Sequence, residues 1–365
     1  MNPSFERLMA EASRLTQTGD LRAATAAIQA ALGGAAVPAP AAPQKNESCV
    51  IDVEAREIKT NVDAPPRLPP PPPPRTEAPA GQFSAGSHTD SAGTRGYKLF
   101  VPPGYTGQAL PLVVMLHGCT QNPDDFAAGT GMNEAARERG VFVLYPAQAQ
   151  THNASRCWNW FKHNHQRRGR GEPAILSGMT RAVMKRYDID PERVYVAGLS
   201  AGGAMAAILG DAYPELFAAV GVHSGLPTGS ATDVKSAFAA MQGAAAVAVA
   251  ASRPRPPTIV FHGDRDTTVV PLNGERVVAG NADAAAPEVE RARSANGHDY
   301  TRSVYRDEAG RVRAEHWLVH GAGHAWSGGS ARGSYTDENG PDATEAMLAF
   351  FLANALRGAP ATGAS

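Results

Sequence analysis

Short apolar runs alternate with segments of helical periodicity along the chain from residue 97 onward. The apolar runs are 97–101, 112–116, 141–145, 194–197, 218–223, 258–262 and 315–319. Helical patterns lie between or after them, at 133–139, 174–187, 201–211, 272–282 and 343–356. Apolar strands that alternate with helices are typical of a parallel sheet covered on both faces. The pattern predicts an α/β fold with a doubly wound, mostly parallel sheet, whose functional groups follow the carboxyl ends of the strands.

The first 93 residues follow a different pattern. Apolar residues recur every three or four positions in 5–15 and in 21–32, which predicts a helical hairpin over residues 1–34. Residues 35–93 are rich in Pro and Ala, and 12 of the 29 prolines lie between Val37 and Ala80, so a disordered linker is predicted there. The run Pro69–Pro74 is expected to be an extended spacer. One catalytic domain is predicted over 94–357, followed by a disordered tail over 358–365.

Two short helices bury little surface alone, so the hairpin is expected to dock on the main domain, on a partner or on another copy of the chain. Self-association or tethering of the protein is the function that such docking would serve.

Charge and hydropathy exclude several classes of protein. The net charge is −1, so no basic field attracts nucleic acid, and no nucleic-acid partner is expected. The longest apolar stretch, Ala244–Ala251, is far shorter than the roughly 20 residues of a membrane span, so none is predicted. Glu6 and Arg7 interrupt the region where a signal peptide would be apolar, so no signal peptide is expected.

The sharpest chemical signal is the sequence GLSAG at 198–202. It follows the apolar run 194–197 and precedes a predicted helix. A G-x-S-x-G sequence at such a turn is a nucleophile elbow, in which the serine has a strained backbone and the flanking glycines make room for the crossing of strand and helix. Ser200 is therefore predicted to be a catalytic nucleophile.

A serine nucleophile needs a base, and the base needs an acid that fixes its tautomer. In this fold the acid and then the histidine follow the serine, each after a strand. Asp264 and Asp266 follow the run 258–262, and we select Asp266 as the acid. His320 and His324 follow the run 315–319, and we select His324 as the base, because the Gly-Ala-Gly turn before it gives the side chain freedom to reach the sheet edge.

The oxyanion of the reaction needs two backbone N–H donors. Ala201, the residue after the nucleophile, supplies one. Cys119, in the loop after the run 112–116, is predicted to supply the other. His117 in the same loop precedes the nucleophile in the chain, so we assign it an ordering role rather than direct catalysis.

Three tryptophans, Trp158, Trp160 and Trp326, are predicted to wall the substrate pocket, with core packing of at least one as the alternative. Asp337, Asn339 and Asp342 could suggest a metal site, but their spacing better fits a turn followed by a helix N-cap at Asp342. No metal and no cofactor are predicted. The chain has only three cysteines, Cys49, Cys119 and Cys157, which leaves open one disulfide and one free thiol.

Residues 94–353 resemble the polyhydroxybutyrate (PHB) depolymerase family of esterases, a branch of the α/β-hydrolases that also contains feruloyl and acetyl-xylan esterases. The resemblance is carried by LHGCTQ at 116–121, CWNWF at 157–161, GLSAGGAM at 198–205, HGDRDTTVVP at 262–271 and GHAWSGG at 323–329. It implies an α/β-hydrolase fold and a Ser200, Asp266 and His324 triad. It also implies a disulfide between Cys119 and Cys157.

The predicted function is that of a serine esterase acting through an acyl-enzyme, with short hydroxyalkanoate oligomers or related esters as substrates. Feruloyl or acetyl-xylan esters, and peptides, are the alternative substrates. An interaction protein that uses the hairpin and the Pro-rich spacer, with a degenerate hydrolase domain, is the alternative of another class. The implied disulfide favours an extracellular or periplasmic location, the lack of a signal peptide favours the cytoplasm, and the two stay open.

Overall fold

The structure is a computed structural model that describes residues 81–244, 255–281, 286–295 and 297–356. All of them belong to the compact unit Pro74–Ser365. The hairpin predicted over 1–34, the first part of the linker predicted over 35–93, and the tail predicted over 358–365 lie outside the described residues.

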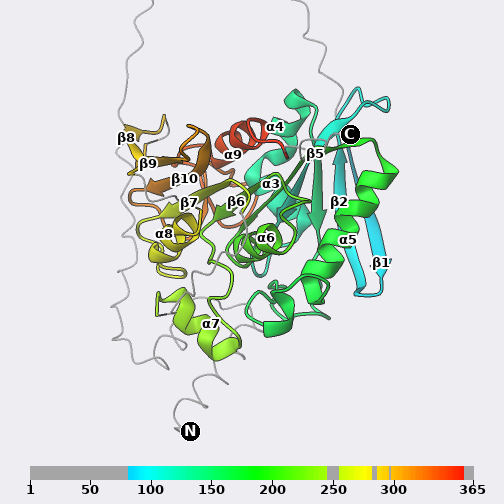
Figure 1. Cartoon of the computed structure of the whole chain (residues 1–365), viewed down its shortest axis with the longest axis horizontal. Coiled ribbons are helices and arrows are strands. Elements are labelled where there is room, and N and C mark those ends of the chain that lie inside the picture. Colours follow the sequence, from blue (N-terminus) through cyan, green and yellow to red (C-terminus); the bar gives the residue numbers. More distant parts are fainter. Residues whose placement is uncertain (1–80, 245–254, 282–285, 296, 357–365) are drawn as a thin grey trace, which may run out of the picture. The chain divides into compact units, whose positions relative to one another are not determined.

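A ten-stranded sheet organises the described domain, with the strands in the order β1-β2-β4-β3-β5-β6-β7-β10-β9-β8 (Figure 1). The strands are β1 (Gln82–Asp90), β2 (Gly93–Val101), β3 (Leu110–Leu116), β4 (Phe142–Pro146), β5 (Ile189–Leu199), β6 (Ala219–His223), β7 (Thr258–Gly263), β8 (Glu288–Arg293), β9 (Asp299–Arg306) and β10 (Val312–Val319). The six central strands, β4, β3, β5, β6, β7 and β10 in sheet order, pair in parallel. The strands toward both edges pair antiparallel. The predicted doubly wound, mostly parallel sheet is confirmed.

Helices cover both faces of this sheet. They are α3 (Pro123–Thr130), α4 (Met132–Arg139), α5 (Gly171–Arg186), α6 (Ala201–Ala212), α7 (Val234–Met241), α8 (Leu272–Ala279) and α9 (Ala343–Leu352), with a short 3-10 turn at His163–His165. The helices α5, α6, α7 and α8 contribute side chains to one apolar core, and α3, α4 and α9 contribute to the other. Figure 1 shows α4 and α9 on the side of the sheet away from α6.

Alternation along the central strands supplies both cores. In β3, Leu112 and Val114 belong to the core under α5 and α6, while Val113 and Met115 belong to the core under α4 and α9. Successive side chains of a strand point to opposite faces, so a strand covered on both faces must be apolar at every position. This is why all seven apolar runs in the sequence lie in central strands or in β2.

Strand β1 corrects one predicted boundary. Residues 82–90 were predicted to belong to the linker, but they form a nine-residue strand that pairs along its whole length with β2, from Gln82 opposite Val101 to Asp90 opposite Gly93. Only Phe83 in this strand is a large apolar residue. The strand is stabilised by backbone pairing and by packing against α5, neither of which leaves an apolar run in the sequence.

The loops after β3, β5, β7 and β10 meet at one edge of the sheet, because these strands run parallel. All the predicted catalytic residues lie on those loops. Among the described residues, no helix is long and apolar enough to cross a membrane.

Candidate active site

Ser200 lies at the turn between β5 and α6, with a backbone φ of 57° and ψ of −119°. A positive φ is costly for a residue with a Cβ, and here the surroundings enforce it. The Ser200 amide donates to the carbonyl of His223 on the neighbouring strand at 2.8 Å. A Cβ on Gly202 would overlap the carbonyl of Leu116, so the helix can cross the strands this closely only with glycine at that position.

Asp266 and His324 are in contact after β7 and β10. His324 Nδ1 lies 2.6 Å from Asp266 Oδ2, and the Asp266 side chain is wholly buried. Burial acts to raise the pKa of Asp266, but hydrogen bonds from His262 and His324, and from the Val269 amide, outweigh it and hold that pKa well below its usual range. An ionised carboxylate only accepts, so Nδ1 of His324 carries the proton and Nε2 is left as a base.

The two residues that were not selected from the sequence also form a pair. His320 Nδ1 lies 3.0 Å from Asp264 Oδ2, and its Nε2 lies 2.9 Å from the hydroxyl of Thr301. The two side chains are 40% and 34% exposed, compared with 13% and 0% for His324 and Asp266. Water therefore screens the His320–Asp264 pair far more than the buried pair.

One pocket of about 490 Å³ contains both Ser200 and His324. Its other lining residues are Gly118, Cys119, Gln121, Leu199, Met241, Thr268 and Tyr335. The serine, the histidine and the predicted oxyanion loop therefore face the same space. Thioether, aliphatic and aromatic groups give this pocket an apolar wall suited to an uncharged substrate.

The loop after β3 is fixed from inside the protein. The buried Gln121 side chain accepts from the Gly118 amide at 2.8 Å and donates to Asp125 at 2.9 Å. His117 Nε2 accepts from the Gln148 amide at 3.2 Å, and burial lowers the pKa of His117 to about 4, so it stays neutral. His117 thus orders the loop and does not open into the pocket, in line with the role inferred from its place in the chain.

A disulfide joins Cys119 to Cys157, the pairing that the family resemblance implies. It ties the loop after β3 to the loop before α5. Neither the Cys119 amide nor the Ala201 amide donates a hydrogen bond within the described part of the chain, so both are available to an acceptor in the pocket.

His223, at the end of β6, holds the loop that carries His324. Its Nε2 accepts from the Ser327 amide at 2.9 Å, and its Nδ1 lies 3.2 Å from the Ser224 hydroxyl. Burial, together with the nearby His262 and His324, lowers the pKa of His223 well below its usual value. A neutral His223 is needed here, because an imidazolium would have no lone pair for the Ser327 amide.

The predicted tryptophan wall is wrong. Trp158, Trp160 and Trp326 are 0%, 6% and 1% exposed, and none of them lines the pocket at Ser200. Trp158 donates to the carbonyl of His117 at 3.1 Å, and Trp326 donates to the Thr344 hydroxyl at 3.0 Å. All three rings are buried in the core, and the indole N–H groups of Trp158 and Trp326 have internal acceptors.

Sequence reasoning missed Met241, Thr268 and Tyr335 as lining residues. Met241 ends α7, Thr268 lies in the loop that carries Asp266, and Tyr335 contacts Thr120 through the two hydroxyls at 3.2 Å. Thr268 lies within the motif HGDRDTTVVP, which was a usable signal. Met241 and Tyr335 carried none.

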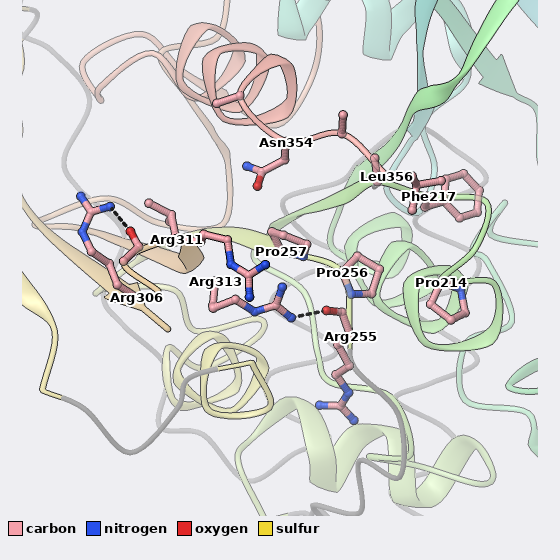
Figure 2. A pocket seen from close by; sticks show the side chains of 15 residues that line it. Pro214, Phe217, Arg255, Pro256, Pro257, Arg306, Arg311, Arg313, Asn354 and Leu356 are labelled. Carbon is pink, nitrogen blue, oxygen red and sulfur yellow. Dashed lines mark hydrogen bonds between the residues drawn. The ribbon is translucent and has the colours of Figure 1, made fainter. Parts of the chain in front are cut away.

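A second pocket of about 490 Å³ lies at the opposite edge of the sheet, where β6, β7 and β10 begin. Figure 2 shows its four arginines, Arg255, Arg306, Arg311 and Arg313, around this hollow. The first three pair with carboxylates at 2.7–3.0 Å. Its lining residues include no serine, cysteine or histidine, so it offers no nucleophile or base.

Asp342 and its neighbours form a turn and a helix start. Asp342 caps α9 by accepting from the Glu345 amide at 2.9 Å, which confirms the predicted N-cap. Within the ranges that the structure describes, no three His, Cys, Asp or Glu side chains are grouped closely enough to hold a metal ion.

Comparison with known proteins gives a consistent family. Residues 95–284 match the model of the family described as "Esterase PHB depolymerase". Poly(3-hydroxyalkanoate) depolymerase C of Paucimonas lemoignei is 32% identical over 61% of this chain and 56% of its own length. Poly(3-hydroxybutyrate) depolymerase of Ralstonia pickettii is 30% identical over 69% of this chain and 56% of its own length. The chain thus spans little more than half the length of these curated relatives.

Other similar proteins are named as feruloyl or acetyl xylan esterases. Feruloyl esterase B of Thermothelomyces thermophilus is 30% identical over 46% of this chain and 63% of its own length. The solved structure of the acetyl xylan esterase from Aspergillus awamori superposes with a TM-score of 0.56 at 22% identity, over 66% of this chain and 94% of that one. This likeness is one of fold.

Proposed function

The chain belongs to the PHB depolymerase family of esterases, and from that premise we propose that it is a serine esterase with Ser200 as nucleophile, His324 as base and Asp266 as acid. Its α/β-hydrolase fold brings the loops after β5, β7 and β10 to one edge of the sheet. The observation that carries the proposal is the pocket that Ser200 and His324 share, with Asp266 hydrogen-bonded behind His324 at 2.6 Å.

The proposed reaction has two acyl-transfer steps. His324 Nε2 takes the proton of the Ser200 hydroxyl as its oxygen attacks the ester carbonyl, and the Cys119 and Ala201 amides donate to the oxyanion. The tetrahedral intermediate collapses to an acyl-serine, and His324 gives the proton to the departing alcohol. Water, deprotonated by the same histidine, then attacks the acyl-serine and releases the acid.

The proposed substrates are short hydroxyalkanoate oligomers or related uncharged esters. The relatives named as depolymerases support the acyl type, and the apolar lining by Leu199, Met241 and Tyr335 suits a neutral chain. Feruloyl or acetyl-xylan esters are the second candidate, supported by relatives of about 30% identity that bear those names. A panel of hydroxybutyrate trimer, methyl ferulate, acetylated xylan and a peptide amide separates these classes by kcat/KM.

Replacement of the nucleophile tests the mechanism. We expect S200A to abolish the acyl-enzyme burst on p-nitrophenyl butyrate and to lower kcat by about 10⁴-fold or more, because it removes the hydroxyl that His324 is proposed to deprotonate. S177A is the matched control, since Ser177 is also a buried serine, and its hydroxyl donates to the Ala174 carbonyl within α5 and does not line the pocket. It should keep the burst and stay within about threefold of the parent in kcat.

Full activity in S200A would refute the triad. Absence of hydrolysis across the whole panel by the unmodified protein would instead favour an interaction protein with a degenerate hydrolase domain.

A further inference from the structure

The two oxygens of the Asp266 carboxylate accept different numbers of hydrogen bonds. Oδ1 accepts from the backbone amides of Thr268 and Val269, each at 2.9 Å. Oδ2 accepts from His324 at 2.6 Å. Two amides fix Oδ1, whereas Oδ2, which faces the proposed base, accepts one of these three hydrogen bonds. A further side chain beside Oδ2 therefore affects how firmly that oxygen is held.

That group is His262, four residues before Asp266 and within β7. Its side chain is 0% exposed. Its Nε2 lies 2.7 Å from the carbonyl oxygen of Val269 and 3.4 Å from Asp266 Oδ2. Both neighbours are acceptors, so a bare lone pair on Nε2 would repel two oxygens at once. The proton of this imidazole is therefore on Nε2, hydrogen-bonded to the Val269 carbonyl, and the Asp266 carboxylate lies beside it as a longer contact at 3.4 Å.

The opposite nitrogen of the same ring supports this tautomer. His262 Nδ1 is buried and has no hydrogen-bond partner among the described residues. A Cβ on Gly274 of α8 would lie 2.8 Å from this Nδ1 and 3.3 Å from Nε2 of His316, which is also buried and unpartnered. An N–H at Nδ1 would be unpaired there, which costs more than an unused lone pair.

We propose that His262 is a positioning residue of the triad, whose Nε2–H locks Asp266 Oδ2 against His324. The inference rests on the serine esterase mechanism proposed above. Val269 acts on the carboxylate in two ways. Its amide donates to Oδ1, and its carbonyl accepts from His262 and so fixes the imidazole beside Oδ2. Burial acts to raise the pKa of Asp266, and the neighbouring His262 and His324 both act to lower it.

The ring can be replaced by amides that mimic each nitrogen separately. The Gln side-chain N–H reaches the place of Nε2, and the Asn side-chain N–H reaches the place of Nδ1. We expect H262Q to keep kcat on p-nitrophenyl butyrate within about threefold of the parent, because the Gln side chain places an N–H donor where Nε2–H was. H262N should lower kcat by about 10- to 100-fold with little change in KM, the loss expected for one hydrogen bond to a charged group.

The matched control is H316Q. His316 is also buried, at 8% exposed, and reaches the same point beside Gly274, but it does not contact Asp266. The substitution should leave kcat and KM unchanged. All rates are divided by the number of active sites that react with a fluorophosphonate, so that unfolded protein does not count, and the melting temperature of each variant is recorded.

Two results would overturn the positioning role. One is an H262N protein that melts at a lower temperature but has the parent kcat per titrated site, because His262 would then only stabilise the loop. The other is an equal loss of kcat in H262Q and H262N. The serine esterase mechanism is tested separately: activity that survives in S200A would refute the mechanism, whatever the His262 variants do.

Discussion

At the level of single residues, two aspartate–histidine pairs lie after the same two strands and differ in what surrounds them. Asp266 and His324 are buried and share a pocket with Ser200. Asp264 and His320 are more than a third exposed, and His320 faces Thr301 instead. The spacing of residues in the sequence allowed either pair, and burial is what distinguishes them.

This difference predicts unequal effects of removing each base. We expect H324A to lower kcat/KM by about 10⁴-fold, since the serine loses its proton acceptor. H320A should change kcat/KM by less than about twofold, because an exposed pair contributes little. Steady-state hydrolysis of p-nitrophenyl butyrate measures both. A larger loss in H320A than in H324A would reverse the assignment of the two pairs.

Residue identity alone misled the sequence analysis at the tryptophans. Tryptophans near catalytic motifs suggested a substrate wall, but the indole N–H groups of Trp158 and Trp326 have acceptors inside the core. Their position depends on which acceptors the fold brings near, and no local pattern encodes that. Met241 escaped notice for the same reason, because α7 reaches the pocket only through tertiary packing.

At the level of elements, the central strands could be predicted and the edges could not. Strands β3 to β7 and β10 are covered on both faces, so burial requires continuous apolar runs that mark them in the sequence. Strand β8 reads Glu-Val-Glu-Arg-Ala-Arg, and it pairs only with β9. Polar edge strands of this kind carry no apolar signal, which is why β1, β8 and β9 were absent from the prediction.

Strand β1 gives a prediction about where the folded domain begins. A chain that starts at Thr94, as the predicted linker would suggest, loses β1 and exposes the whole edge of β2. We expect it to melt at least about 2 °C below a chain that starts at Gly81, since lost pairing and lost packing on α5 together exceed about 1 kcal/mol. Calorimetry of the two shortened chains measures the difference. Equal melting temperatures would show that β1 is dispensable.

The disulfide between Cys119 and Cys157 gives a second prediction for an element. It closes a loop of 38 residues, for which chain entropy predicts a contribution of about 3–4 kcal/mol. The double variant C119S/C157S should lose up to that much unfolding free energy in urea. Its kcat should fall more than its KM rises, because the Cys119 amide is proposed to donate only to the developing oxyanion.

Reduction by dithiothreitol is the control for this prediction. The parent should then approach the double variant in both stability and kcat, whereas the variant itself should not respond. A parent that keeps its full stability after both thiols are shown to be free would contradict it.

At the level of the whole described domain, buried histidines predict how stability depends on pH. Burial lowers the pKa of His117 and of His316 to about 4, and that of His223 well below its usual value. Unfolded histidine takes a proton near pH 6.5. The unfolded chain therefore binds more protons below that pH, so the stability that these residues contribute is present above pH 6.5 and is lost as the pH falls toward 4.

The variant H316Q tests the contribution of one of these histidines to the pH dependence of stability. Each buried histidine should contribute a slope of about 1.4 kcal/mol per pH unit to the unfolding free energy between pH 4 and 6.5. H316Q removes one such contribution, so its stability should fall less steeply than that of the parent between pH 6.5 and 5. Urea unfolding at several pH values measures both slopes. Parallel curves would contradict the prediction.

The charged pairs along β8 have a consequence for the protein in concentrated solution. Among the residues that the structure describes, this strand ends the sheet, and an unpaired strand edge can bind an edge of another molecule and extend the sheet across both. Here Arg306 pairs with Glu288 at 3.0 Å and Arg302 with Glu290 at 3.5 Å, with the side chains between about a third and two thirds exposed. An approaching strand would have to dehydrate these ion pairs, so we expect β8 to disfavour aggregation through this edge.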